Sequence, residues 1–130
     1  MKKLLLEIVY WSWCLPQTLL GLILKLIFKG EKYNNYYVYT YQGGSISLGK
    51  YVLITHYSKD NSRIVKHELG HQKQSFILGW LYLIVIGLPS LIWCHVIHSL
   101  VCKLKKKYVS YYSFYTEAWA DKLGGVNVLQ

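Results

Sequence analysis

The chain has 130 residues, which is enough for one small domain and too few for two. Hydrophobic residues make up 53% of it, and 15 Lys and Arg against 6 Asp and Glu give a formal net charge of +9. The basic residues stand in short groups beside apolar runs and not on one solvated face. This pattern favours an anionic lipid membrane as partner and argues against a nucleic acid.

The first apolar segment covers residues 4–28 and is long enough to cross a bilayer, which takes about 20 residues. Because Glu7 interrupts the apolar run and no A-x-A-like cleavage site follows, we expect a retained N-terminal membrane segment and not a signal peptide. Pro16 divides the segment, which leaves a kinked span and a short helical hairpin both open. The second half carries a thin polar stripe at helical spacing, made of Thr18, Gly21, Lys25 and Lys29. Such a stripe is typical of a helix that packs on protein or lies at an interface.

The second block, residues 36–57, is rich in Tyr, Val, Ile and Thr and is broken at Gln42-Gly43-Gly44. This pattern predicts a β-hairpin. Its second strand covers residues 45–55, where Gly49 marks a bulge or a point of close backbone approach.

The third block combines a helix with a long apolar run. We predict an active-site helix over residues 63–86 and an apolar helical hairpin over residues 76–107, because "GLPS" at 87–90 is a turn signal inside the run. The run, residues 76–102, is again long enough to cross a bilayer. Lysines flank it on both sides, so positive charge does not assign its ends to different compartments. The polar turn before the helix offers three N-caps, Asp60, Asn61 and Ser62.

The active-site helix contains the motif "HELGH". His67 and His71 are four residues apart and therefore lie on one face of a helix, where both imidazoles can bind one metal ion. Glu68 lies one position round and can assist a bound water without being a ligand. A catalytic zinc needs three protein ligands and an open fourth position, so a third ligand must come from elsewhere in the chain.

The last block, residues 110–124, predicts a helix that ends at Gly124. It carries Glu117 and Asp121, the only two acids after Glu68 in the sequence. They are four residues apart and share a face. We expect Glu117 to be the third zinc ligand and Asp121 to accept a hydrogen bond from the far ring nitrogen of a ligating histidine. A solvated helix face with an ordinary exposed acidic pair is the alternative, and the matching spacing of the two motifs argues against it.

"HELGH" followed by "EAWAD" resembles the H-E-x-x-H and E-x-x-x-D pattern of the gluzincin zinc metallopeptidases. The sequence is similar to their membrane-embedded branch, the CAAX prenyl proteases and the heat-shock membrane proteases, and to the minigluzincins. The resemblance covers residues 36–125 in outline, and the two motifs match closely. It implies these site residues: His67, His71 and Glu117 as zinc ligands, Glu68 as general base and Asp121 as support.

The same resemblance implies that an extended substrate adds to the strand at 45–55 by β-augmentation. The chain departs from its relatives after Asp121, because no histidine or arginine follows that could stabilise an oxyanion. Four other residues could take this role: Tyr111, Tyr112, Tyr115 and His56.

The remaining ligand-type residues give weaker signals. His95, His98 and Cys102 fall on one helical face, and we interpret them as a polar seam against a neighbouring helix and not as a second metal site. Cys14 and Cys94 complete the three cysteines, which form no CxxC pair. We expect reduced, buried apolar side chains and no disulfide framework.

Together these elements predict an α+β fold, with one mostly helical, membrane-associated domain over residues 1–130 and a small β-hairpin or edge strand. The leading hypothesis is a membrane-associated zinc metalloendopeptidase, in which Glu68 assists the attack of zinc-bound water on a peptide bond. The expected partners are a peptide or protein substrate, free or membrane-associated, and an anionic lipid membrane. Basic residues cluster around the site, so we expect it to face the cytoplasm near the lipid headgroups.

Two other classes of function stay open. One is a noncatalytic small membrane protein in which a structural zinc or a hydrogen-bonded clamp ties the helices together. The other, suggested by size and charge alone, is a small pore-forming or partner-binding membrane peptide.

Overall fold

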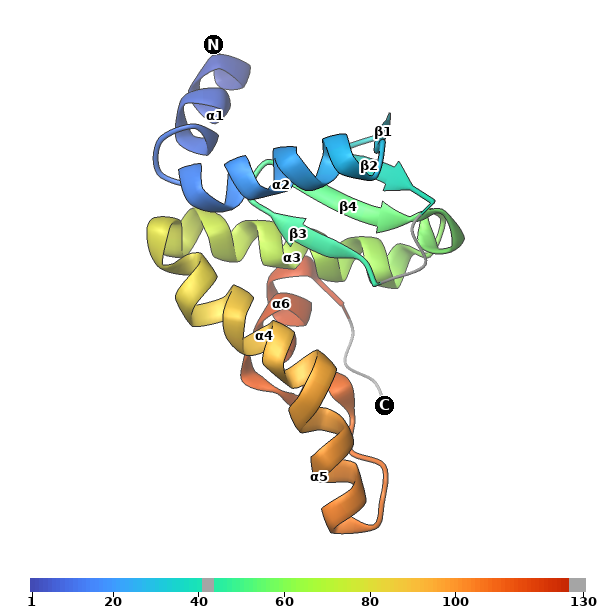
Figure 1. The fold of residues 1–130 in the computed structure, drawn as a ribbon. Helices are drawn as coiled ribbons and strands as arrows, with labels where there is room; N and C mark the ends of the chain where they lie inside the picture. Colours follow the sequence, from blue (N-terminus) through green and yellow to red (C-terminus); the bar gives the residue numbers. More distant parts are fainter. Residues whose placement is uncertain (41–43, 127–130) are drawn as a thin grey trace.

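The computed structural model describes residues 1–40 and 44–126 (Figure 1). It combines helices with a small four-stranded sheet, which confirms the predicted α+β class. The helices are α1 (Lys2–Tyr10), α2 (Leu15–Ile27), α3 (Ser62–Leu78), α4 (Leu88–Ile92), α5 (His98–Lys105) and α6 (Tyr115–Gly124). The strands are β1 (Glu31–Tyr33), β2 (Tyr36–Tyr39), β3 (Ile46–Leu48) and β4 (Tyr51–Thr55).

The sheet lies between α2 on one face and α3 on the other (Figure 1). Its strand order is β1-β2-β4-β3, with β2 parallel to β4 and β3 antiparallel to β4. The predicted hairpin over residues 36–57 is therefore wrong, because β4 inserts between β2 and β3. All residues of β4 are buried, as a central strand covered on both faces requires. Part of the predicted break, Gln42-Gly43, lies outside the described residues.

Tight turns connect the antiparallel strands. Gly49 begins the turn between β3 and β4 with a φ of +59°, the conformation that a type II′ hairpin turn needs from glycine. The predicted strand over residues 45–55 is therefore two strands. The expected close approach is present, since a Cβ on Gly49 would overlap the side chain of Thr18 in α2. Asn34 turns the chain between β1 and β2 with a φ of +53°, which asparagine tolerates better than most residues.

The N-terminal segment 4–28 does not form one span, because a turn at residues 11–14 separates α1 from α2. Pro16 lies in the first turn of α2, where its missing N–H leaves no helical bond unmade. Thr18 and Gly21 are buried against the sheet, and Thr18 Oγ1 accepts a hydrogen bond from the backbone N–H of Lys50 at 3.2 Å. The polar stripe of α2 thus marks a helix packed on protein.

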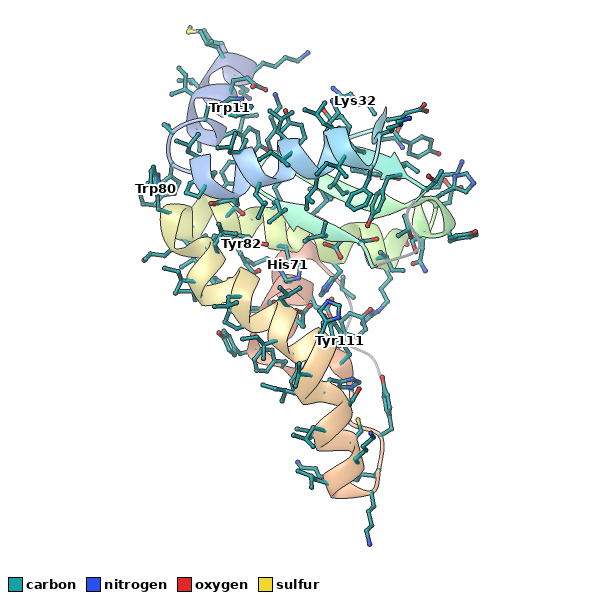
Figure 2. The ribbon with its side chains drawn as sticks, in the orientation of Figure 1. Trp11, Lys32, His71, Trp80, Tyr82 and Tyr111 are labelled. Carbon is teal, nitrogen blue, oxygen red and sulfur yellow. The ribbon has the colours of Figure 1, made fainter. Side chains whose placement is uncertain are left out.

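The turn between α1 and α2 contacts the end of α3, at the edge of the molecule where Figure 2 labels Trp11 and Trp80. Three hydrogen bonds join the two regions: Trp13 Nε1 to Phe76 O (2.8 Å), Gln17 Nε2 to Gly79 O (2.9 Å) and Trp80 Nε1 to Ser12 O (2.8 Å). Carbonyl groups in the last turn of a helix lack partners within the helix. The N-terminal segment therefore caps α3 as well as covering the sheet.

The helix that carries "HELGH" is shorter than the predicted 63–86. It ends at Leu78, where Gly79 turns the chain with a φ of +54°. A Cβ on Gly79 would overlap the ring of Trp13. The chain is then helical over Leu83–Lys105, and among the described residues this is the one helix long and apolar enough to cross a membrane.

The predicted turn at 87–90 is wrong, and with it the apolar helical hairpin over 76–107. Pro89 lies inside the helix, where it removes the N–H that would bond the carbonyl group of Val85. Tyr115 replaces that donor, because its hydroxyl donates to Val85 O at 2.7 Å. Wider π-type turns precede and follow α4 and accommodate the proline within one continuous helix.

The chain returns from this helix without a second long helix. Lys106 ends α5 with a φ of +52°, and residues 106–114 contain only the 3-10 turn Tyr111–Ser113. α6 then begins later than the predicted residue 110, and it ends at Gly124 as predicted. It packs against α3, so the C-terminal acids come back to the "HELGH" helix.

Candidate metal centre

Close contact between α3 and α6 brings the two motifs together. A Cβ on Gly70 would overlap the carbonyl group of Ala120, and a Cβ on Gly124 would overlap the carbonyl group of Lys66. Only glycine at both positions lets the two helix backbones approach this closely. Asn61, one of the three expected N-caps, starts α3 by accepting hydrogen bonds from two backbone N–H groups of the first turn.

Three buried side chains form the centre: His67, His71 and Glu117. Oε2 of Glu117 lies 2.9 Å from Nε2 of His67 and 3.2 Å from Nε2 of His71. The potential ligand atoms of the group all lie within 4.8 Å of one another. Figure 2 shows His71 between the sheet and the helix Leu83–Lys105, in the middle of the molecule. The group can hold a metal ion, and it consists of the three residues that the sequence predicted as ligands.

The outer ring nitrogens of both histidines have acceptors of their own. Nδ1 of His67 lies 2.7 Å from Oδ1 of Asp121, the contact that the sequence predicted. Nδ1 of His71 lies 2.7 Å from Oε1 of Gln74, whose Nε2 donates to the carbonyl group of Thr116 at 3.0 Å. With Nδ1 as the donor in each ring, the Nε2 lone pairs are left for a metal ion. Gln74 was not predicted, although its position three residues after His71 is the signal that could have found it.

A second line of hydrogen bonds holds the carboxylate of Glu117. Thr116 Oγ1 donates to Glu117 Oε1 at 3.1 Å, and Ser90 Oγ donates to Thr116 Oγ1 at 2.8 Å. Ser90 is part of "GLPS", which was predicted to form a turn. It lies in a helix and contacts α6. One oxygen of Glu117 is thus fixed by the protein, and the other faces the histidines.

The electrostatics of the group match its hydrogen bonds. Burial opposes a charge on His67, but its hydrogen bonds to Glu117 and Asp121 and the charge of Glu68 outweigh this and raise the pKa of His67 to about 8. Burial also opposes a charge on Glu117, yet hydrogen bonds from both histidines lower the pKa of its carboxyl. Without a metal the group therefore holds a proton between imidazole and carboxylate, at the place that a cation would take.

Glu68 is buried beside this group with 7% of its surface exposed. Burial raises the pKa of its carboxyl, and the charge of Glu117 adds to this, while His71 and His67 act in the opposite direction. A carboxyl group beside a potential metal site is placed to accept a proton and to release it again.

Tyr112 and Arg63 lie close to His67 and to its partner Asp121. The ring of Tyr112 lies edge-on to it, with centroids 5.1 Å apart. The guanidinium of Arg63 lies over the Tyr112 ring at 4.0 Å and donates to Oδ2 of Asp121 at 3.4 Å. Arg63 was not predicted, although it precedes His67 by four residues and so shares its face.

Of the four residues considered for an oxyanion, Tyr112 has a ring in contact with that of His67. The hydroxyl of Tyr115 is bound to Val85 O, and the ring of His56 packs on Tyr57. The ring of Tyr111 lies edge-on to that of Tyr112, and burial together with the charges of Glu117 and Glu68 raises the pKa of the Tyr111 hydroxyl (Figure 2 labels Tyr111).

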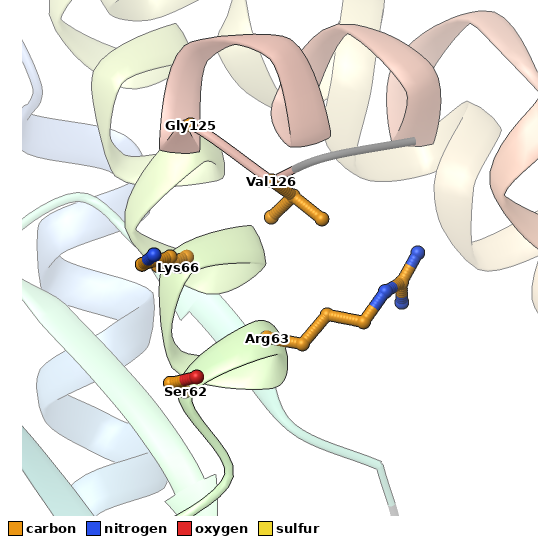
Figure 3. A pocket seen from close by; sticks show the side chains of 5 residues that line it. All are labelled: Ser62, Arg63, Lys66, Gly125 and Val126. Carbon is orange, nitrogen blue, oxygen red and sulfur yellow. The ribbon is translucent and has the colours of Figure 1, made fainter. Parts of the chain in front are cut away.

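A shallow pocket opens at the start of α3, beside the end of α6 (Figure 3). It contains none of the five predicted site residues, and Arg63 extends out of it with its guanidinium bound to Asp121. The residues that line it are Ser62, Arg63, Lys66, Gly125 and Val126.

Of the suggested polar seam against a neighbouring helix, His98 and Cys102 contact Val109 in the non-helical return segment instead, and His95 is exposed. His98 Nε2 donates to Val109 O at 2.6 Å, and Sγ of Cys102 accepts from the N–H of Val109 at 3.3 Å. Within the described residues, the group formed with Glu117 is the one potential metal site found. All three cysteines are free, as expected, but only Cys14 is buried and Cys94 is exposed.

Comparisons with protein-family models, with curated proteins and with solved structures found no match. What the chain does must therefore be argued from its own residues and from the geometry of this centre.

Proposed function

We propose that the protein is a membrane-associated zinc metalloendopeptidase of the gluzincin type. The observation that carries the proposal is the buried group of His67, His71 and Glu117, with Asp121 on the outer nitrogen of His67. Two motifs that are about fifty residues apart in sequence supply this group. The fold brings their ligand atoms within 4.8 Å of one another, so that three side chains can bind one zinc ion.

The donor set favours zinc among the divalent metals. Two imidazole nitrogens and one carboxylate oxygen are the ligands of many catalytic zinc sites, whereas calcium and magnesium prefer oxygen alone. Three protein ligands leave one coordination position for substrate or water. When bound there, zinc polarises a carbonyl group and makes water a stronger acid.

Glu68 acts as the general base in this proposal. Its carboxylate takes a proton from the water that attacks the scissile carbonyl carbon, and then gives that proton to the amine as the C–N bond breaks. The raised pKa of the buried Glu68 carboxyl supports this role, because it lets one group carry out both transfers.

Tyr112 is the residue that we assign to the oxyanion. Its ring lies edge-on to that of His67, and the guanidinium of Arg63 lies over it. A phenolic hydroxyl at this place can donate to the developing negative charge on the carbonyl oxygen.

The substrate is a peptide segment in extended conformation. β3 is one of the two edge strands of the sheet and packs on α3. In this proposal the backbone of a peptide pairs with the outer side of β3 and directs a carbonyl group toward the metal centre, which requires the Tyr82 hydroxyl to release the carbonyl group of Ser47 that it bonds at 2.8 Å. The substrate is either soluble or membrane-associated.

Membrane association rests on the long apolar helix Leu83–Lys105 and on the net charge of +9. We place the catalytic face toward the cytoplasm, because Lys66 and Lys73 lie in the active-site helix and cytoplasmic segments carry an excess of basic residues.

The zinc content of the detergent-purified protein tests the site directly. We expect about one zinc per chain, lost or strongly reduced in His67→Ala and in Glu117→Ala. Lys122→Ala, in the same helix as Glu117, is the matched control and should keep its zinc. A parent protein that binds no zinc when the metal is supplied at neutral pH would remove the proposal.

A second function, a noncatalytic clamp, has one observation in its favour. His67 already bonds Glu117 and Asp121 directly, and these contacts join α3 to α6 without a metal. A clamp predicts that His67→Ala lowers the melting temperature strongly, and that no peptide substrate is cleaved. The peptidase predicts cleavage that depends on Glu68.

A further inference from the structure

The far half of the helix Leu83–Lys105 projects from the molecule together with the chain that returns from it. We call residues 93–114 the finger; it extends away from the sheet in Figure 1. Within it, Trp93 Nε1 donates to Tyr111 O at 2.9 Å, and the rings of Trp93 and Phe114 stack with centroids 4.7 Å apart. Nearer the tip, Val109 bonds to His98 and Cys102. The return segment is thus bound along the side of the helix.

Both ends of the finger belong to the same body of the protein. At its base, Ser90 bonds Thr116 and Tyr115 bonds Val85. The helix that follows the finger then supplies Glu117 to the metal centre in α3. A helix that crossed the membrane here would therefore need a second crossing to bring the chain back.

The return segment is unsuited to that second crossing. Residues 106–114 are helical only over the 3-10 turn Tyr111–Ser113. In the hydrocarbon core of a bilayer, backbone N–H and C=O groups must be satisfied within the protein, so only helices and closed barrels span it. A short irregular segment bound to one side of a single helix meets neither condition.

The tip of the finger carries a dense positive charge. Its four lysines are exposed, and the sequence has no acidic residue between Glu68 and Glu117 to balance them. Lysine near the middle of a bilayer is strongly disfavoured, whereas lysine beside anionic headgroups is favoured. The four are Lys103, Lys105, Lys106 and Lys107.

The outer side of the same helix is apolar along its length. Large exposed side chains recur every three to five residues from the start of the helix to the tip: Ile84, Leu88, Leu91, Val96, Leu100 and Leu104. The side that faces the return segment carries the polar groups of His98 and Cys102, beyond the stacked ring of Trp93. An apolar stripe, a polar side and flanking lysines are the features of a helix that lies within the membrane interface.

We propose that the helix Leu83–Lys105 does not cross the membrane but lies in the plane of one anionic leaflet, with its apolar stripe in the lipid and the lysines of the tip among the headgroups. The start of α3 and the tip of the finger are then on the same side of the membrane. This inference rests on the membrane association proposed above, and it is independent of zinc and of catalysis.

Binding of the full-length chain to vesicles tests the lipid contact. The probes are vesicles of phosphatidylcholine alone and of phosphatidylcholine with phosphatidylglycerol in equal parts. We expect binding to the anionic vesicles to fall about 20-fold in Lys105→Gln/Lys107→Gln, since two lysines leave the headgroup layer. The matched control, Lys66→Gln/Lys122→Gln, changes the charge equally in α3 and α6, outside the finger, and should bind like the parent.

Two results of this experiment would overturn the proposal. If the parent binds neither kind of vesicle, the apolar stripe contacts a protein, and the membrane part of the proposed function falls with this inference. If the tip variant and the control lose the same affinity, the charge acts over the whole molecule and not at the tip.

Labelling of intact cells separates the in-plane arrangement from a crossing. Ser62→Cys marks the start of α3 and Lys107→Cys marks the tip, each in a Cys94→Ser background that also serves as the blank. With a membrane-impermeant maleimide, both positions should react from the same side, and only after permeabilisation if the site faces the cytoplasm. Reaction of one position from outside and of the other only after permeabilisation would overturn the in-plane arrangement and leave the zinc site untouched.

Discussion

Two regions of the molecule distribute polar and apolar residues in opposite ways. One is the contact between α3 and α6, and the other is the helix Leu83–Lys105. In the contact, charged and polar side chains are buried and bonded to one another, as His67 and Asp121 are. On the helix, large apolar side chains such as Leu88 and Leu100 are more than half exposed. A protein built only for water buries its large apolar groups and leaves its charges outside. The first region can thus hold a cation, and the second exposes the apolar surface that we propose to contact lipid.

The largest expected effect tests the catalytic role that we propose for the contact between α3 and α6. Glu68→Gln keeps the size of the buried side chain but removes proton transfer, so peptide cleavage should fall by about 10²- to 10⁴-fold. Zinc content should stay the same, because Glu68 is not among the ligand group. Measuring cleavage and zinc in the same sample separates the two. Undiminished cleavage by Glu68→Gln would contradict the assigned base.

The next effect tests the close helix contact on which the centre depends. Gly70→Ala places a Cβ against the carbonyl group of Ala120, and the helices must move apart. We expect a loss of roughly 1–3 kcal/mol in the free energy of unfolding, together with weaker zinc binding. Gly44→Ala is the control, since nothing lies within 4 Å of its added Cβ. Equal melting temperatures for the two variants would mean that α3 and α6 do not need this approach.

The third effect is a pH dependence of the metal-free protein. The folded pKa of His67 is raised from 6.5 to about 8, so its contribution is complete below pH 6.5 and is lost as the pH rises through 8. The difference corresponds to about 2 kcal/mol of unfolding free energy. Glu117 has a lowered pKa and contributes in the opposite sense, but only in the acid range.

Zinc binding should show the opposite pH dependence. The metal needs the unprotonated imidazole, so its affinity should rise over the same interval in which the metal-free protein loses stability. Unfolding curves and zinc titrations of one preparation across this interval measure both slopes. Glu117→Gln removes the main partner of the protonated His67 ring. It should therefore make the stability of the metal-free protein less dependent on pH. If stability of the metal-free parent rises with pH over this interval, the proton shared between His67 and Glu117 is absent.

The sequence predicted the centre better than the path of the chain around it. Helical spacing alone places His67 with His71, and Glu117 with Asp121, on common faces, and these four residues meet as expected. The supporting contact of Gln74 has the same local signal, since it follows His71 at helical spacing. Such contacts depend on local geometry, which the spacing of residues determines.

The errors arose where tertiary contacts override local signals. β2 pairs with β4 and not with β3, the next strand along the chain, because a strand that is buried at every residue is best placed at the centre of the sheet. Gly79 ends α3 because Trp13, far away in sequence, occupies the space of a side chain. The sequence around Gly79 gives no sign of this distant contact. The turn predicted at "GLPS" failed for a similar reason.

The smallest expected effect tests the long helix at Pro89, through the hydrogen bond of Tyr115 to Val85 O. Pro89 leaves the carbonyl group of Val85 without a helical donor, and the Tyr115 hydroxyl supplies one at 2.7 Å. Tyr115→Phe should therefore cost about 1 kcal/mol of unfolding free energy, the usual contribution of one hydrogen bond. Tyr57→Phe, with a ring that is 79% exposed, is the control and should change nothing measurable.

The double variant Tyr115→Phe/Pro89→Ala completes this test. Alanine at position 89 restores the N–H that bonds the Val85 carbonyl, so loss of the Tyr115 hydroxyl should then matter much less. The effects of the two substitutions on the free energy of unfolding would then not add. The difference from additivity would show that Pro89 lies inside a continuous helix, where it deprives the Val85 carbonyl of its donor. If the effects simply add, Val85 and Tyr115 do not share this bond, and the chain turns at "GLPS" after all. Such a turn would shorten the helix below the length of the finger and would remove the basis for an in-plane contact with the membrane.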